Sequence, residues 1–129
     1  MRILMVEFAG KGGMGTYGEA LCQGLCQVEQ DVTVLTSPAW PKRSSHFKVE
    51  RCIIELTAGK HQGPKIYWAM NRLIIGITNS LRRNRFALKH APDVVHLQNG
   101  QPLIDQFFLK NLARHLPLVL TVHDVKRHN

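Results

Sequence analysis

Apolar residues along the chain follow two alternating patterns. The first is a short, nearly continuous run of branched apolar residues, such as "ILMV" at 3–6 and "LVLTV" at 118–122. Runs of this kind, bounded by glycine, proline or polar residues, indicate strands. The second is a longer segment with an apolar residue every three or four positions, which indicates a helix. Together these patterns predict the order βαββαβαβ, with strands at 2–7, 31–37, 47–57, 93–98 and 118–123.

Three segments carry the helical pattern. Thr16 and Glu19 match the T-x-x-E capping box, so the first helix is expected to begin near Thr16. A second helix is expected to end near Arg85, and a third to lie within 103–115. The second has the clearest apolar face, formed by Ile66, Met70, Leu73, Ile74, Ile77 and Leu81.

Apolar strands that alternate with helices favour a mostly parallel sheet covered on both faces. Right-handed crossovers then place the strands in the order 3-2-1-4-5, which is a Rossmann-like, doubly wound α/β fold. Ligands of such sheets bind beyond the carboxyl ends of the strands, where the strand order reverses. Here that point lies between the first and fourth strands. The glycine loop at 10–15 is therefore expected to face "QNG" at 98–100, with "HD" at 123–124 one strand further along.

The glycine loop, in "EFAGKGGMGTYGEA" at 7–20, is the most informative stretch. Its glycines match G-x-G-x-x-G at Gly10, Gly12 and Gly15. A dinucleotide site also needs an acid at the end of the second strand, where this chain has Thr36 and Ser37. A nucleoside-triphosphate loop needs Lys-Ser or Lys-Thr after its last glycine, and Thr16 stands there instead. Close backbone amides at a helix N-terminus still suit a phosphate or a sugar hydroxyl. A tight turn that binds nothing is the alternative.

Length and composition describe one ordinary globular domain spanning 1–129. The chain has 129 residues, of which 44% are hydrophobic and 20% charged. No apolar run approaches the roughly 20 residues that a membrane span needs, and no signal peptide is recognisable. Three cysteines without a C-x-x-C pair suit reduced thiols in the cytoplasm. A zinc site at Cys22 and Cys26 is a disfavoured alternative.

The positive charge lies in one segment. Residues 42–89 contain eleven Lys and Arg residues against two Glu residues, a net charge of +9 in a chain whose total is +8. With Trp40 and Trp68 nearby, this segment suits peripheral contact with an anionic membrane or with a lipid phosphate. A solvated basic face is the plainer interpretation. Nucleic acid is disfavoured, because "SLRRNRF" at 80–86 has neither a helix-turn-helix pattern nor interleaved aromatics.

Three stretches, which carry four motifs in the same order, resemble a known family. They are "RILMVEFAGKGGMGTYGEALCQGLCQVEQDVTVLT", "PDVVHLQNG" and "LPLVLTVHD", the last two giving a "D-V-V-H" strand and a "T-x-H-D" strand end. Together they resemble the N-terminal lobe of the retaining glycosyltransferases of the GT-B fold, family 4 (group 1). The chain departs from the family at "VEQD", 28–31, where Gly-His is usual. It also contains no E-x7-E, a motif of the family's second lobe.

The resemblance implies a hexosyltransferase that moves a sugar from a nucleotide-sugar donor to a glycan or lipid-linked acceptor with retention of configuration. The chain corresponds to the acceptor-side lobe. The donor-binding C-terminal lobe is absent from it and is expected in the same or a partner chain, so this lobe alone is expected to be inactive. We expect no metal and no cofactor, since no Asp-x-Asp occurs. Work at the inner membrane face on a lipid-linked precursor is the preferred hypothesis.

The resemblance also implies roles for individual residues. His123 would contact the donor sugar, and Asp124 would position His123 or cap a turn. The donor or acceptor would lie against the amides of the loop residues Gly12, Gly13, Met14 and Gly15. His96, Gln98 and Asn99 are further candidates for acceptor or donor contact, although a histidine inside a strand is at least as often structural. A non-catalytic Rossmann-like module that binds a nucleotide or a glycan is the alternative function.

Overall fold

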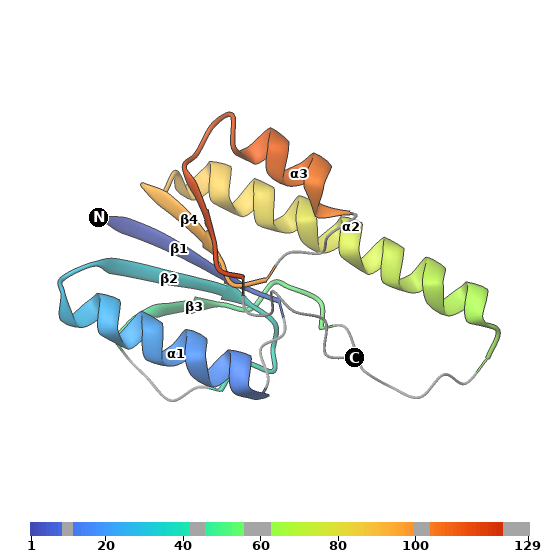
Figure 1. Ribbon diagram of the computed structural model, residues 1–129, viewed down its shortest axis with the longest axis horizontal. Coiled ribbons are helices and arrows are strands. Elements are labelled where there is room, and N and C mark those ends of the chain that lie inside the picture. Colours follow the sequence, from blue (N-terminus) through green and yellow to red (C-terminus); the bar gives the residue numbers. More distant parts are fainter. Residues whose placement is uncertain (9–11, 42–45, 56–62, 100–103, 123–129) are drawn as a thin grey trace.

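The structure, a computed structural model, describes residues 1–8, 12–41, 46–55, 63–99 and 104–122. Five parallel strands form one sheet in the order β3-β2-β1-β4-β5, as predicted from the sequence (Figure 1). The order of strands and helices is also as predicted. The strands are β1 (Arg2–Glu7), β2 (Asp31–Thr36), β3 (Lys48–Glu50), β4 (Val94–Leu97) and β5 (Leu118–Leu120).

Helices cover both faces of the sheet. On one face lies α1 (Gly12–Gln27), and on the other lie α2 (Lys65–His90) and α3 (Asp105–Leu112) (Figure 1). Alternate residues of the strands build the two cores, because successive side chains of a strand point to opposite faces. Met5 packs with Cys22 of α1, whereas Val6 belongs to the cluster that contains Ala87 of α2 and Leu112 of α3. The molecule is thus the three-layer α/β fold expected from the sequence.

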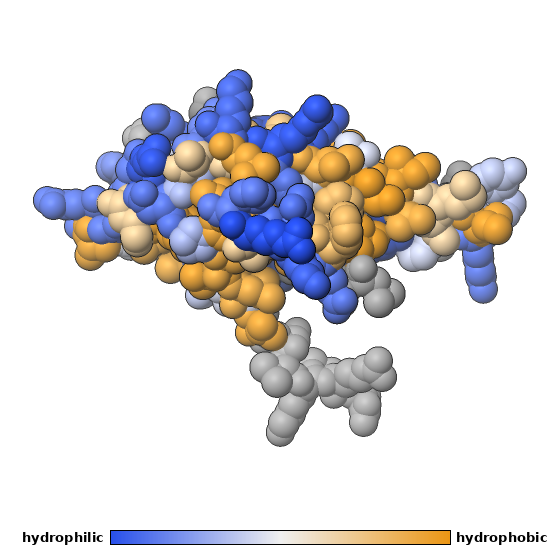
Figure 2. Space-filling model, turned by 90° about the horizontal axis from the view of Figure 1, so that it is seen from above, coloured by the Kyte–Doolittle hydropathy of each residue, from blue (hydrophilic) through white to orange (hydrophobic). Residues whose placement is uncertain are grey.

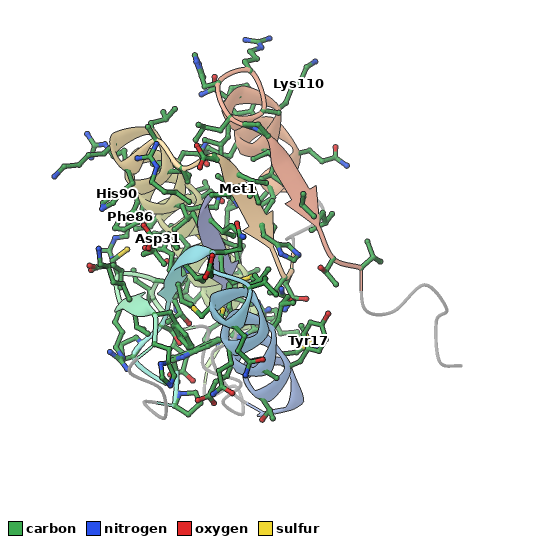
Figure 3. All side chains as sticks on the ribbon, turned by 90° about the vertical axis from the view of Figure 1, so that its left-hand side faces the viewer. Met1, Tyr17, Asp31, Phe86, His90 and Lys110 are labelled. Carbon is green, nitrogen blue, oxygen red and sulfur yellow. The ribbon has the colours of Figure 1, made fainter. Side chains whose placement is uncertain are left out.

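The strands align so that their carboxyl ends form one edge. Val6 of β1 pairs with Leu35 of β2 and with Leu97 of β4. The opposite, amino edge carries Met1 and Asp31, which Figure 3 shows at the near end of the molecule. Asp31, the acid of β2, therefore lies away from any ligand at the carboxyl edge.

The predicted start of the first helix is wrong. Helix α1 begins at Gly12, four residues before Thr16. Gly12 has φ +67°, a conformation that glycine adopts without strain, so the backbone can enter the helix directly from the glycine loop. The Thr16 hydroxyl then donates to the Gly12 carbonyl oxygen at 3.3 Å instead of capping, and Glu19 is buried.

Three further boundaries differ from the predicted ones. Strand β5 ends at Leu120 rather than at position 123. The third strand covers only Lys48–Glu50, because the chain then turns across the end of β2, where the Ile53 amide donates to the Thr36 carbonyl at 3.1 Å. Helix α2 continues to His90, beyond the predicted end at Arg85. It ends at Ala91, a left-handed residue whose amide donates to the Ala87 carbonyl at 2.9 Å, as in a helix C-cap.

The predicted apolar face of α2 is exposed rather than buried. Its residues Ile66, Met70, Leu73, Ile74, Ile77 and Leu81 are all exposed. The face that packs on the protein is instead formed by Gly76, Asn79, Ser80, Arg83, Asn84 and Ala87. The periodicity correctly indicated a helix, but the apolar face does not pack on the protein, because the N-terminal half of α2 has no sheet beneath it.

Helix α2 is longer than the sheet that it covers. Its 26 residues span about 39 Å, while a six-residue strand spans about 20 Å. Its C-terminal end is fixed at the amino edge, where the Arg2 guanidinium donates to the Ala91 carbonyl at 2.7 Å. Its N-terminal half therefore projects past the carboxyl edge of the sheet, as Figure 1 shows.

Candidate functional site

A row of polar residues follows the apolar strands at the carboxyl edge. Glu7 ends β1, Thr36 ends β2 with Ser37 after it, and Gln98 and Asn99 follow β4. All are buried except Asn99, which is half-buried. Because β1 is the neighbour of both β2 and β4, these residues lie side by side along the edge where α/β sheets bind their ligands.

Glu7 and Asn99 meet across the point where the strand order reverses. The Asn99 side-chain amide donates to Glu7 Oε1 at 3.4 Å, which joins β4 to β1 at this edge. Gln98 differs from its neighbour, because its backbone amide donates to the Val6 carbonyl at 3.0 Å and its side chain lies against Met5 Sδ at 3.1 Å. Of the two predicted amides, Asn99 is thus the one beside the acid at the switch point, and Gln98 is packed inside.

The end of β2 contributes two buried hydroxyl groups. Within the part of the chain that the structure describes, neither Thr36 Oγ1 nor Ser37 Oγ has a hydrogen-bond partner. Buried polar groups are nearly always hydrogen-bonded, since leaving one unpaired costs about 1–3 kcal/mol. These hydroxyls therefore mark the β2 end of the edge as a place that favours a polar group.

The glycines open the N-terminus of α1. Gly12 and Gly13 are exposed, Met14 is half-buried and Gly15 is buried. A Cβ atom built on Gly12 or on Gly13 meets nothing within 4 Å among the described residues. The first turn of α1 has no acidic residue, so its amides and the positive end of the helix dipole can attract an anion. Gly10 lies outside the described residues.

His96 lies within β4, next to Met5 in register, and not at the strand end. Its Nε2 is 2.7 Å from Thr121 Oγ1, and burial lowers the pKa of the imidazole below its usual value. The neutral form that this favours suits a hydrogen bond between strands. The Thr121 amide donates to the Leu97 carbonyl at 2.9 Å, so the chain reaches the carboxyl edge just before position 123. His123 and Asp124 themselves lie outside the described residues.

Sequence reasoning missed a buried ion pair behind the site. Arg83 of α2, counted above among the basic surface residues, is fully buried and contacts Asp105 Oδ1 at 2.8 Å. Ser80 donates to the same oxygen at 2.7 Å, and the guanidinium carbon of Arg83 lies 5.8 Å from the centre of the Phe8 ring. Burial lowers the pKa of Arg83, while Asp105 opposes that shift. The pair fixes the first turn of α3 to α2, and α3 in turn begins soon after Asn99.

Other classes of site gain no support within the described ranges. No three His, Cys, Asp or Glu side chains gather there in a way that could hold a metal ion. None of the described helices is both long and apolar enough to cross a membrane.

Comparisons with known proteins agree with this geometry. Residues 11–129 match the sequence pattern described as Glycosyltransferase Family 4. Among solved structures, the crystal structure of MurG from Acinetobacter baumannii is similar, with a TM-score of 0.50 and 12% sequence identity. The similarity covers 99% of this chain but only 43% of that protein, so the chain spans less than half of its length. Among curated proteins, none matches the chain.

The family match covers most of the chain and includes the "PDVVHLQNG" and "LPLVLTVHD" stretches on which the resemblance was based. The structural similarity agrees with the predicted sheet order and layers. The chain therefore belongs to glycosyltransferase family 4, and its domain has the Rossmann-like fold of the GT-B type.

Proposed function

We propose that this domain is the N-terminal, acceptor-side lobe of a retaining glycosyltransferase that takes a hexosyl unit from a nucleotide sugar. The observation that carries the proposal is the meeting of Glu7 and Asn99 beside the glycine-rich start of α1, at the switch point of the sheet. This arrangement brings a carboxylate, an amide and the first-turn backbone N–H groups of α1 to one ligand. Neutral amides that both donate and accept suit sugar hydroxyls, and helix N-termini suit phosphates.

The roles in this proposal follow from the placement of each group. The amides of Gly12 and Gly13 bind the donor phosphates or the acceptor, because they lie in the first turn of α1, where backbone N–H groups suit anions. A Cβ built on either glycine meets nothing within 4 Å among the described residues, so a ligand can approach the backbone closely. Asn99 and Glu7 orient a hydroxyl of the acceptor. His123 contacts the donor sugar and Asp124 positions it, since the chain returns to the carboxyl edge at Thr121. Backbone amides and the helix dipole supply the charge compensation, without a metal or cofactor.

The proposal includes a second lobe, in the same or a partner chain, that binds most of the donor. The reaction then takes place between the two lobes, on a glycan or lipid-linked acceptor at the cytoplasmic face of a membrane. A lipid-linked acceptor is supported by the net charge of +9 in residues 42–89, which attracts phosphate groups and anionic headgroups.

The test is a transfer assay on the protein together with its second lobe. Radiolabelled nucleotide sugars are offered one at a time, with total lipid and glycan extracts as acceptors, and the anomeric configuration of the product is read by NMR. We expect label to pass from one donor to an acceptor with its configuration retained, and Asn99→Ala to reduce transfer. Binding of a nucleotide or glycan without any consumption of donor would instead support the non-catalytic binding module.

A further inference from the structure

One surface of the molecule is unused by the proposed transfer reaction. Ile66, Met70, Leu73, Ile74, Ile77 and Leu81 form an exposed apolar row on α2, called here the α2 stripe. Their exposed fractions range from 37% to 66%. Figure 2 shows apolar surface over the part of α2 that projects beyond the body of the protein. A contiguous apolar surface of this kind on a domain marks a contact with a partner or a membrane.

The stripe lies close to the candidate site. It belongs mostly to the N-terminal half of α2, which extends past the carboxyl edge of the sheet (Figure 1). Glu7 and Asn99 lie at that same edge. Whatever covers the stripe is therefore held beside the polar groups that we propose to bind the acceptor.

The charges on α2 restrict which kind of partner can cover the α2 stripe. Helix α2 contains no Asp or Glu, and its exposed cations are Lys65, Arg72, Arg82, Arg85 and Lys89. With 3.6 residues per turn, Arg82, Arg85 and Lys89 fall on the side of the stripe that faces away from the buried face of the helix. Tyr67 is exposed beside the stripe, whereas Trp68 and Arg72, whose guanidinium carbon lies 4.7 Å from the centre of a Trp68 ring, lie on the opposite side of the helix. An apolar row with an amphipathic aromatic ring beside it, on a helix whose other sides carry cations and no acids, is the composition of a helix that lies in a membrane interface.

Other occupants fit these observations less well. Two copies that paired through the stripe would bring two purely cationic helices together, in a chain whose net charge is already +8. A nucleic acid would match the cations but would leave the apolar row in water. An anionic bilayer satisfies both features, because its headgroups attract the cations and its acyl chains cover the apolar side chains.

We propose that the α2 stripe inserts into the surface of an anionic lipid bilayer and holds the carboxyl edge of the sheet against the headgroups. The use of this contact, to present a lipid-linked acceptor to the site, rests on the proposed function. The contact itself requires no sugar transfer, so it can be measured separately.

The experiment is sedimentation of the full chain with vesicles of phosphatidylcholine alone and with vesicles that also contain phosphatidylglycerol. We expect binding to the anionic vesicles only. Met70→Gln/Ile74→Gln should weaken it by roughly tenfold or more, since two exposed apolar side chains no longer enter the bilayer. Arg85→Gln/Lys89→Gln should weaken it by roughly tenfold as well. The matched controls are Val28→Gln/Phe107→Gln, exposed apolar residues outside α2, and Arg51→Gln/Arg114→Gln, which removes the same charge elsewhere; both should bind as the parent does.

A second readout locates the contact on α2. Trp68 lies on the side of α2 opposite the stripe, and Trp40 is buried against α1 on the other face of the sheet. Brominated lipids should therefore quench a tryptophan introduced into the stripe by Ile74→Trp, and they should quench the two tryptophans of the parent less. Circular dichroism on each variant separates a loss of binding from a loss of folding.

Three results would overturn the proposal. They are equal binding to neutral and anionic vesicles, no quenching of the tryptophan introduced by Ile74→Trp in bound protein, and a dimer in sedimentation velocity that Met70→Gln/Ile74→Gln dissociates. The last result would assign the stripe to an interface between copies of the chain. Failure of the transfer assay with intact vesicle binding would reject the proposed function and leave the membrane contact standing. Transfer without vesicle binding would reject the membrane contact and leave the proposed function standing.

Discussion

Trp40 packs against α1 at Gly18, where the helix has no side chain. A Cβ atom built on Gly18 would lie 2.9 Å from Trp40 Cη2 and 3.4 Å from its Cζ3. Trp40 is buried, and its rigid ring system cannot move aside as the end of a long flexible side chain can. The segment after β2 is thus held against α1 by one glycine in the middle of the helix.

Gly18→Ala is therefore expected to destabilise the protein. Overpacking costs about 1–3 kcal/mol, and the better helix propensity of alanine offsets at most about 1 kcal/mol. We expect a net loss of about 1–2 kcal/mol in the free energy of unfolding, measured by urea denaturation. Gly24→Ala is the matched control, because a Cβ there meets nothing within 4 Å, and it should be neutral or stabilising. Equal stability of the two variants would contradict the packing argument.

Gly13→Ala should separate folding from binding. The position has open space for a Cβ and no positive φ, so the variant should be as stable as the parent or slightly more stable. A ligand that rests on the Gly13 amide would meet the new methyl group, and we expect its affinity to fall roughly tenfold. Calorimetric titration with the donor and acceptor identified by the transfer assay measures this. Unchanged affinity would show that no ligand approaches this amide.

Removing one partner of the Arg83–Asp105 pair should cost more stability than replacing both partners. Asp105→Ala leaves a fully buried guanidinium without its carboxylate, a change that typically costs about 3–5 kcal/mol. Replacing both partners by apolar residues of similar size, as in Arg83→Met/Asp105→Leu, should cost less than Asp105→Ala alone. A double-mutant cycle in urea measures the coupling. Additive effects of the two sites would mean that the pair contributes nothing as a pair.

His96 predicts a dependence of stability on pH. Burial lowers the pKa of His96 in the folded protein, so the unfolded chain binds its proton at a higher pH than the folded chain does. The contribution of His96 is therefore fully present above the usual histidine pKa of about 6.5 and is lost as the pH falls below it towards the lowered value. His96→Gln removes this contribution, so its melting temperature should fall less than that of the parent between neutral and mildly acidic pH. Parallel curves for the two proteins would exclude His96 as the cause.

The order and pairing of the strands could be predicted from the sequence because they depend on local patterns and general rules. A short apolar run such as Ile3 to Val6, followed by glycines, indicates a strand, and β1 is one. The handedness of parallel crossovers then leaves few arrangements of five strands. The position of the carboxyl edge, and hence of Glu7 and Asn99, followed from the same rules.

The packing partners of individual side chains and helix faces could not be predicted in the same way. The row from Ile66 to Leu81 marks a helix face, but its sequence does not say whether protein, lipid or another chain covers that face. Arg83 was assigned to the surface because buried arginines are rare, and only the fold shows that Asp105, 22 residues away, supplies the partner charge. Thr16 matched a cap motif, yet Gly12 allowed the helix to begin earlier.

Helix α2 is attached to the rest of the protein only towards its C-terminal end, as far as the described contacts show. Arg2 ties its C-terminal end to the amino edge of the sheet, and the Arg83–Asp105 pair is a second, buried point of support further along. The remaining N-terminal turns extend free of the sheet. Because the ion pair joins the two helices, any tilt of α2 acts on Asp105, the first residue of α3, which lies six residues after Asn99.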